Sequence, residues 1–173
     1  MELLEALKNR HSIRKFTEDP VTKAEMEDLV RCAVLAPTTS NMQAWRFAAV
    51  TDPALVKKII RFSPGISGNP SAILALCTDQ EIASAKGGEV CGREFATIDI
   101  SLAAENAMLR AVDLGLGSCA VKSFQEKAVR KLLNVPEHIR VEYLIALGRP
   151  AAEGNSPARR PMEEVLVYDR FDK

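Results

Sequence analysis

Three residues near the start of the chain alternate in a way that suits the binding of a phosphate group. Arg10, Ser12 and Arg14 stand at every second position, so in an extended segment their side chains point to one side. Guanidinium groups pair with phosphate oxygens at two points, and a serine hydroxyl adds a neutral donor. The alternative is a solvated basic turn after a helix, where cations suit the negative end of the helix dipole. Spacing alone favours this alternative, because short basic runs are common.

Other catalytic arrangements find little support in the sequence. The histidines are His11 and His138, and no Gly-x-Ser-x-Gly sequence is present, which argues against a serine hydrolase triad. Neither histidine has a second nitrogen or thiolate ligand close in sequence, so no metal site is predicted. The turn at 115–117 lacks the third glycine of a dinucleotide-binding loop and follows a helix, not a strand. A hydride-transfer enzyme with this sequence would need another kind of nucleotide site.

Composition excludes several classes of partner. The 173 residues include 23 Lys and Arg and 23 Asp and Glu, so no net charge attracts nucleic acid or an anionic membrane. No apolar run approaches membrane-spanning length, and the N-terminus does not resemble a secretory signal. The length fits one domain. The four cysteines lie far apart, which argues against a zinc site or a redox dithiol and favours a reducing cytoplasm.

Helices and strands are interspersed along the chain, which favours an α+β fold over a doubly wound parallel sheet. The basic run follows a first helix that ends near Asn9, and Thr22 with Glu25 predicts a capping box for the second helix. The helix over 98–116 is rich in alanine and poor in charge, so it is predicted to be buried, centrally or against a partner chain. Strands are predicted at 45–50, 72–77, 118–124 and 141–147, and further helices after Asp52-Pro53 and at 125–133.

Two segments, 79–94 and 150–173, differ from the regular helices and strands in composition. Residues 79–94 are polar and contain several glycines, which predicts a loop and a candidate mobile flap. Cys91 falls in this segment and is a candidate for a redox or substrate-contact role, for which a cysteine needs a lowered pKa. The tail over 150–173 contains the apolar residues Val165 to Tyr168, which are expected to pack as an edge strand on the domain or on a second subunit. Asp99 is interpreted as a favourable charge near a helix start.

An ordered series of motifs resembles the nitroreductase family across nearly the whole chain. The series comprises Arg10-His11-Ser12-Ile13-Arg14, then 36–45 (APTTSNMQAW), 114–119 (LGLGSC), 147–150 (LGRP) and 159–161 (RRP). The resemblance implies an α+β fold with a central, mostly antiparallel sheet flanked by helices. It also implies an FMN-dependent oxidoreductase that takes hydride from NADH or NADPH and then reduces a nitroaromatic, a quinone or a related acceptor in a two-step, ping-pong reaction. The family further implies a homodimer with FMN sites at the subunit interface.

The resemblance also assigns residues to the cofactor. Arg10 and Ser12 would hold the FMN phosphate and ribityl chain, together with Arg159 or Arg160 from the tail. Arg14 would lie by the pyrimidine end of the ring and stabilise its reduced form, while His11 would contribute mainly backbone contacts. The flavin bound by the other subunit would be reached by Pro37, Thr38, Thr39, Ser40, Asn41 and Gln43. Backbone contacts to the reactive edge of the ring would come from Ala120, Val121, Lys122 and Ser123, with the Lys122 amide nearest flavin N5.

The sequence departs from the family at three places. Ala44 stands where many members have proline, and the segment 64–69 lacks the basic residue that many members direct at the ring. Either Arg14 therefore acts alone or Lys122 assists it. The chain is also short before the long helix, where the family covers its substrate. Two alternatives stay open: a flavin-binding protein without efficient NAD(P)H turnover, and a site for another phosphorylated ligand.

Overall fold

A single antiparallel sheet forms the centre of the molecule. The computed structural model describes residues 1–152, 154 and 156–171. Within these residues four strands pair in the order β1-β2-β4-β3, every pair antiparallel. They are β1 (Trp45–Val50), β2 (Ala72–Asp79), β3 (Gly117–Val121) and β4 (Ile139–Gly148). The predicted α+β fold with a mostly antiparallel sheet is confirmed.

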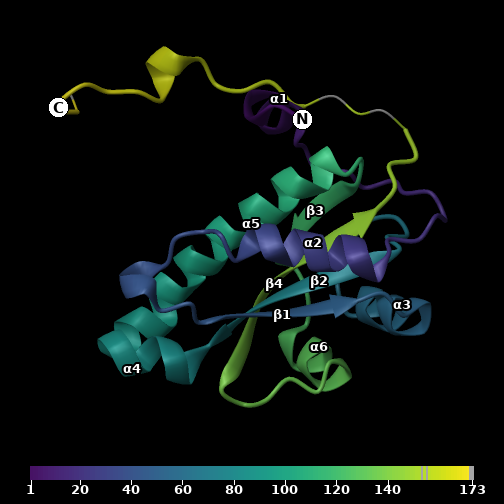
Figure 1. Cartoon of the computed structure of the whole chain (residues 1–173), viewed down its shortest axis with the longest axis horizontal. Helices are drawn as coiled ribbons and strands as arrows, with labels where there is room; N and C mark the ends of the chain where they lie inside the picture. Colours follow the sequence, from purple (N-terminus) through teal and green to yellow (C-terminus); the bar gives the residue numbers. More distant parts are fainter. Residues whose placement is uncertain (153, 155, 172–173) are drawn as a thin grey trace.

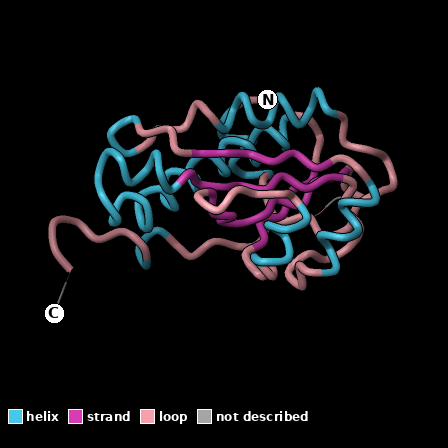
Figure 2. Tube along the Cα trace, turned by 90° about the horizontal axis from the view of Figure 1, so that it is seen from below, coloured by secondary structure: helices cyan, strands magenta, loops and turns pink. Residues whose placement is uncertain are grey.

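Helices cover both faces of the sheet, so the strands form a middle layer (Figures 1 and 2). The helices α2 and α5 pack on one face, and α3 and α6 contribute to the core on the other. Their bounds are α1 Leu3–Asn9, α2 Lys23–Ala33, α3 Pro53–Arg61, α4 Gln80–Val90, α5 Ala96–Asp113 and α6 Glu126–Leu132. None of the helices in this described part of the chain combines the length and apolarity needed to cross a bilayer.

The central strand β2 is buried along its whole length because both of its faces are covered. Leu74 and Leu76 belong to the core under α2 and α5, whereas Ile73 and Cys77 belong to the core on the opposite face. Burial, together with the negative charge of Glu142, raises the pKa of Cys77 to about 12. Cys77 is therefore a neutral, unreactive thiol at physiological pH.

The second helix begins at the predicted capping box. The Thr22 hydroxyl accepts from the Glu25 backbone amide at 3.2 Å, and the Glu25 carboxylate accepts from the Thr22 amide at 2.9 Å. Arg149, which directly follows β4, donates to the same carboxylate at 2.7 Å. Burial alone would raise the pKa of Glu25, but the hydrogen bonds from Thr22 and Arg149 outweigh it and lower the pKa. The cap therefore joins α2 to the sheet through an ionised glutamate.

Glu25→Gln is expected to lower the free energy of unfolding by about 1–2 kcal/mol at pH 7, because a cap and a charge-assisted bond are weakened together. A carboxyl with a lowered folded-state pKa stabilises the fold above its unfolded pKa of about 4.3, and this contribution is lost as the pH falls through the folded value. The gap between Glu25→Gln and wild type should therefore close below that range. Urea unfolding across pH checks this, with Glu27→Gln as the control because Glu27, among the described residues, forms an ion pair only with exposed Arg31. A gap that persists at low pH would contradict the assignment.

The long helix α5 is buried along one face only. Small residues such as Ala103, Ala104 and Ala107 pack against the sheet and α2, while Ile98 and Leu102 are 56% and 44% exposed. The prediction of a long buried helix is confirmed for the alanine face. The second face leaves large apolar side chains in contact with water in the single chain.

Residues 80–94 are helical, which corrects the prediction of a loop over 79–94. Asp79 caps α4 by accepting from the Ile82 amide at 3.1 Å, and the chain bends at Gly87 and Gly88 before a π-helical turn, Cys91–Phe95, leads into α5. Cys91 is buried, not exposed, because its sulfur occupies the space that a side chain at Gly87 would fill. Mobility of this segment stays a prediction.

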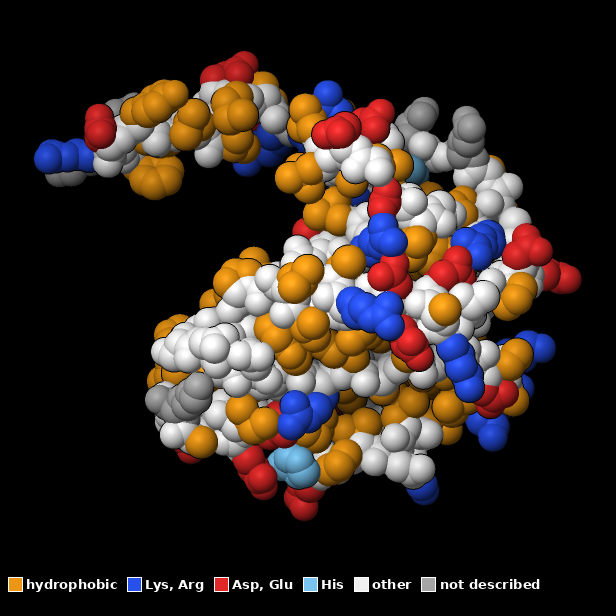
Figure 3. Space-filling model, in the orientation of Figure 1, with side chains coloured by type: hydrophobic (Ala, Val, Ile, Leu, Met, Phe, Trp, Pro, Cys, Tyr) orange, Lys and Arg blue, Asp and Glu red, His pale blue; other side chains and the backbone are white. Residues whose placement is uncertain are grey.

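The tail leaves the body of the molecule as an extended arm (Figure 1). A short 3₁₀ turn, Met162–Glu164, interrupts it, and hydrophobic side chains gather along it (Figure 3). Tyr168 and Phe171 are 81% and 86% exposed, so the prediction of an edge strand packed on the chain's own domain is wrong. Packing on a second subunit stays a prediction, and positions 153, 155, 172 and 173 of the predicted extension lie outside the described residues.

Candidate functional site

The basic run after α1 is extended, as predicted, and lies beside β3. The Ile13 amide donates to the Ser118 carbonyl at 2.9 Å, and Ser12 forms a parallel bridge with Ser118. Gly117 permits this close approach, because a Cβ there would lie 2.7 Å from the Ile13 side chain. Ile13 therefore faces the sheet, and its neighbours Ser12 and Arg14 are available to a ligand on the other side.

Both ends of the chain meet at one cavity. Its volume is about 370 Å³, and it is lined by Arg10, His11, Ser12, Arg14, Pro157 and Arg159. The structure thus brings together the three alternating residues and one of the two tail arginines. Arg160 turns away, and its Nε donates to the Glu164 carboxylate at 3.1 Å.

The charge in this cavity suits an anion. Arg14 and Arg159 form no ion pair with any other described residue, and Arg10 has only a weak one, with its Nε 3.4 Å from Glu105 Oε1. Several guanidinium groups held close together without matching carboxylates attract a phosphate, which accepts their hydrogen bonds. The residues present therefore fit the phosphate end of FMN.

His11 contributes its side chain to the cavity wall, which the sequence did not indicate. Its Nδ1 lies 2.7 Å from the Asn9 carbonyl oxygen, so Nδ1 carries the hydrogen. Its Nε2 is buried and has no hydrogen-bond partner among the described residues. Nε2 lies close to the backbone of Gly154, where a Cβ would come within 2.4 Å of it.

The residues predicted for the ring edge lie next to the basic run. Ala120 and Val121 end β3, whereas Lys122 and Ser123 come after the strand, which corrects its predicted end at position 124. The Gly65 amide donates to the Ser123 carbonyl at 3.0 Å. Gly68, at a φ of +74°, lies so close to the Arg14 backbone that a Cβ would come within 2.3 Å of its oxygen. Three segments, 10–14, 64–68 and 120–123, therefore converge.

The third predicted group, the loop containing Pro37, Thr38, Thr39, Ser40, Asn41 and Gln43, is anchored by a residue from α5. The Thr39 amide donates to both oxygens of Asp99 at 3.0 Å, and its hydroxyl donates to Oδ1 at 3.1 Å. Asp99 is buried and serves as a loop anchor, so its interpretation as a helix-dipole charge was incomplete. Ser40, Asn41 and Gln43 all have positive φ, and Gln43 donates from its side chain to Asn41 Oδ1 at 2.9 Å. The exposed loop thus has a defined, partly strained shape.

Comparisons with known proteins agree with this arrangement. The model of the family described as Nitroreductase matches residues 7–63 and 62–149. The chain belongs to the nitroreductase family. It is 31% identical over 195 residues to an NADH dehydrogenase of Thermus thermophilus, covering 94% of this chain and 93% of that protein. It is 29% identical to an FMN reductase (NADPH) of Bacillus subtilis, covering 98% and 74%.

A solved nitroreductase structure confirms the fold. The structure, from Bacillus subtilis, superimposes with a TM-score of 0.86 at 26% identity and covers 99% of this chain and 75% of that one. The prediction of a nitroreductase-like oxidoreductase is confirmed at the level of the family.

In this nitroreductase chain the predicted cofactor residues lie in two separate places. The phosphate residues and the ring-edge residues are neighbours, and the loop 37–43 lies apart from them. The loop between α2 and β1 lies near the start of α5, and the basic run lies near the other end of this helix (Figure 1). One chain therefore does not bring Asn41 and Gln43 to the cavity of Arg10 and Arg159. A site that uses both groups needs a second copy of the chain.

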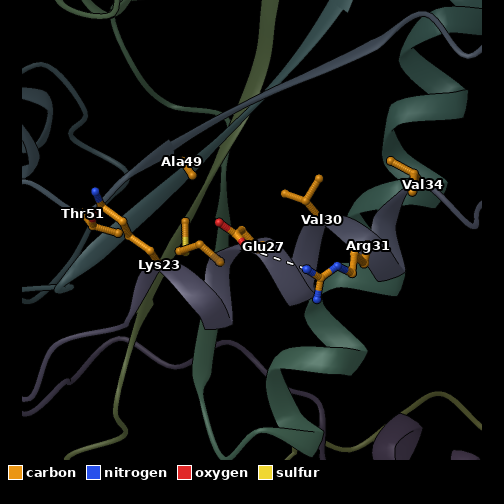
Figure 4. A pocket seen from close by; sticks show the side chains of 8 residues that line it. Lys23, Glu27, Val30, Arg31, Val34, Ala49 and Thr51 are labelled. Carbon is orange, nitrogen blue, oxygen red and sulfur yellow. Dashed lines mark ion pairs between the residues drawn. The ribbon is translucent and has the colours of Figure 1, made fainter.

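A second cavity lies away from these groups, between α2 and β1 (Figure 4). It has a volume of about 490 Å³ and is lined by Lys23, Met26, Glu27, Val30, Arg31, Val34, Ala49 and Thr51. The charged pair in its wall, Glu27 and Arg31, is largely exposed, with 3.7 Å between its atoms. None of the predicted FMN residues lines it.

Proposed function

We propose that this member of the nitroreductase family is an FMN-dependent oxidoreductase that takes hydride from NADH or NADPH and passes it to a nitroaromatic, a quinone or a similar small acceptor. The observation that carries the proposal is the cavity where Arg10, Ser12 and Arg14 meet Arg159 from the far end of the chain. The names of two relatives, an FMN reductase (NADPH) and an NADH dehydrogenase, support the choice of donor.

Different residues would contact different parts of the cofactor. Arg10, Ser12 and Arg159 would bind the phosphate and ribityl chain, and the Lys122 amide would meet the ring near N5. FMN, when bound, supplies an isoalloxazine ring that accepts and returns a hydride. Arg14, a cation without a carboxylate partner among the described residues, stabilises negative charge on the reduced ring. No protein nucleophile is needed, and protons can come from water.

The functional unit would be a homodimer. The loop 37–43 lies apart from the phosphate cavity within one chain, and Ile98 and Leu102 expose an apolar stripe on α5. The apolar side chains of the tail are also exposed in the single chain. A second copy would cover these surfaces and bring its loop to the ring. The cytoplasmic location indicated by the sequence stays a prediction.

The test uses the colour of the purified protein. We expect a flavin spectrum with FMN bound, loss of the yellow colour on anaerobic addition of excess NADH or NADPH, and its return when a quinone or nitroaromatic is added. Colour that NAD(P)H does not remove would favour the alternative, a flavin-binding protein without efficient turnover. A colourless protein that also fails to take up added FMN would exclude both flavin functions and leave another phosphorylated ligand.

A further inference from the structure

A buried carboxylate lies at an irregularity in the centre of the sheet. Leu76 pairs with Tyr143 and Cys77 pairs with Val141, so Glu142 is an extra residue in β4 at this point. Such a bulge redirects a side chain. Glu142 is only 2% exposed, and a carboxylate so deeply buried must be neutralised by specific partners.

One oxygen of Glu142 has strong partners within the fold. Oε1 accepts from the Thr78 hydroxyl at 2.7 Å and from Arg140 Nε at 2.6 Å. Arg140 also donates from Nη2 to the Arg93 carbonyl at 3.2 Å and to the Thr97 hydroxyl at 2.8 Å. The charge of Glu142 is thus neutralised by an arginine that is itself held by the π-helical turn and the start of α5.

The other oxygen faces Lys122, just after β3. Lys122 Nζ lies 3.9 Å from Glu142 Oε2 and donates a hydrogen bond to the Glu142 backbone oxygen. The lysine side chain is 73% exposed, so its long stem would otherwise sample many conformations. Because Arg140 already balances the carboxylate, Lys122 adds a surplus positive charge at a fixed position.

We propose that Glu142 is a positioning residue that fixes Lys122 and the chain after β3 beside the flavin ring. The inference rests on the proposed function, since the backbone of Lys122 is expected to meet the ring near N5. It adds Glu142 and Arg140, which do not reach the cofactor cavity themselves, to the residues that determine the shape of the site. Glu142 acts through Lys122 and touches no reacting atom.

The Glu142→Gln substitution isolates the charge of this residue. Glutamine keeps an oxygen that can accept from Thr78 and Arg140, so the sheet retains its hydrogen bonds. The two cations, Arg140 and Lys122, then lose the anion between them and repel each other. Lys122 is the exposed and flexible one of the pair, so it is pushed outward and is held only by its hydrogen bond to the backbone oxygen of residue 142.

The first measurement is the reactivity of Lys122 in the purified protein. Brief treatment with acetic anhydride followed by peptide mass spectrometry gives the extent of acetylation at Lys122 relative to exposed Lys127. This ratio should rise about threefold in Glu142→Gln, because in the wild type the ammonium of Lys122 is held and reacts less readily. A threefold change corresponds to an interaction energy typical of two residues in contact. Glu137→Gln, an exposed glutamate five positions earlier, should leave it unchanged. An unchanged ratio in Glu142→Gln would show that the carboxylate does not hold Lys122 and would overturn the inference.

The second measurement is the rate at which saturating NADPH bleaches the flavin. Glu142→Gln and Lys122→Met should each slow this bleaching about fivefold. The double variant should bleach no more slowly than either single variant, because Glu142 acts through Lys122. FMN affinity should stay within about twofold of wild type, since the phosphate clamp is intact. Additive losses, or a parallel loss of FMN, would indicate a merely structural role and overturn the inference.

The two proposals can fail separately. If the wild type bleaches and Glu142→Gln bleaches equally fast, the positioning role is wrong and the proposed function stands. If the wild type binds no flavin or is not reduced by NAD(P)H, the proposed function fails and the positioning role at the flavin falls with it, whatever the lysine reactivity.

Discussion

Arg159→Ala is expected to weaken FMN binding about 10- to 100-fold, the scale of losing a charge-assisted hydrogen bond to a phosphate. Arg159 lines the cavity with Arg10, Ser12 and Arg14 and forms no ion pair with another described residue. Within the described part of the chain its guanidinium therefore has no competing carboxylate and is available to bind an anion.

The adjacent arginine is a matched control. Arg160 is directed at Glu164, with 3.1 Å between Nε and the carboxylate, and also donates to the Glu164 carbonyl. Arg160→Ala removes the same charge one position away and should change the FMN dissociation constant less than about twofold, because exposed pairs of this kind contribute little. Quenching of FMN fluorescence on titration with the protein measures both variants at one ionic strength. Equal losses in the two variants would mean that net charge, not the cavity, determines the affinity.

The order of elements and the basic run could be predicted because both depend on local sequence. The first helix ends at Asn9, so residues 10–14 are extended, and the Thr22–Glu25 cap is set by residues three positions apart. The α+β fold follows from the same local patterns. The sequence also contains a signal that distinguishes Arg159 from Arg160, because Glu164 lies four residues after Arg160 and pairs with it.

The rest depends on contacts between distant residues. Asp99 anchors Thr39 across sixty positions, and Glu142 joins Thr78 to Lys122 through a bulge that strand periodicity does not reveal. The helix over 80–90 was missed because its glycines and polar residues resemble a loop, and Cys91 is buried by a close contact at Gly87. Packing, not propensity, decides these features.

The second large effect expected concerns the division of the site between two chains. A clamp variant, Arg10→Ala with Arg159→Ala, should lose FMN because its own phosphate cavity is disabled. A loop variant, Asn41→Gly with Gln43→Gly, should also bind FMN weakly, because two exposed side chains are removed while glycine retains the positive φ of both positions. Each variant alone forms dimers in which both sites carry the same defect.

Mixed dimers of the two variants should recover FMN at one of their two sites. In such a dimer the intact clamp of the loop variant faces the intact loop of the clamp variant, and the second site carries both defects. Co-expression with two different affinity tags and purification through both tags isolates the mixed dimer, which should bind about one FMN per dimer at a concentration that leaves either parent almost empty. A doubly tagged dimer of the clamp variant alone controls for the tags and should stay empty. Residues 37–43 do not line the cavity of Arg10 and Arg159 within one chain. Absence of this recovery would therefore show that the loop of the second subunit does not contribute to FMN binding, and would overturn the shared site.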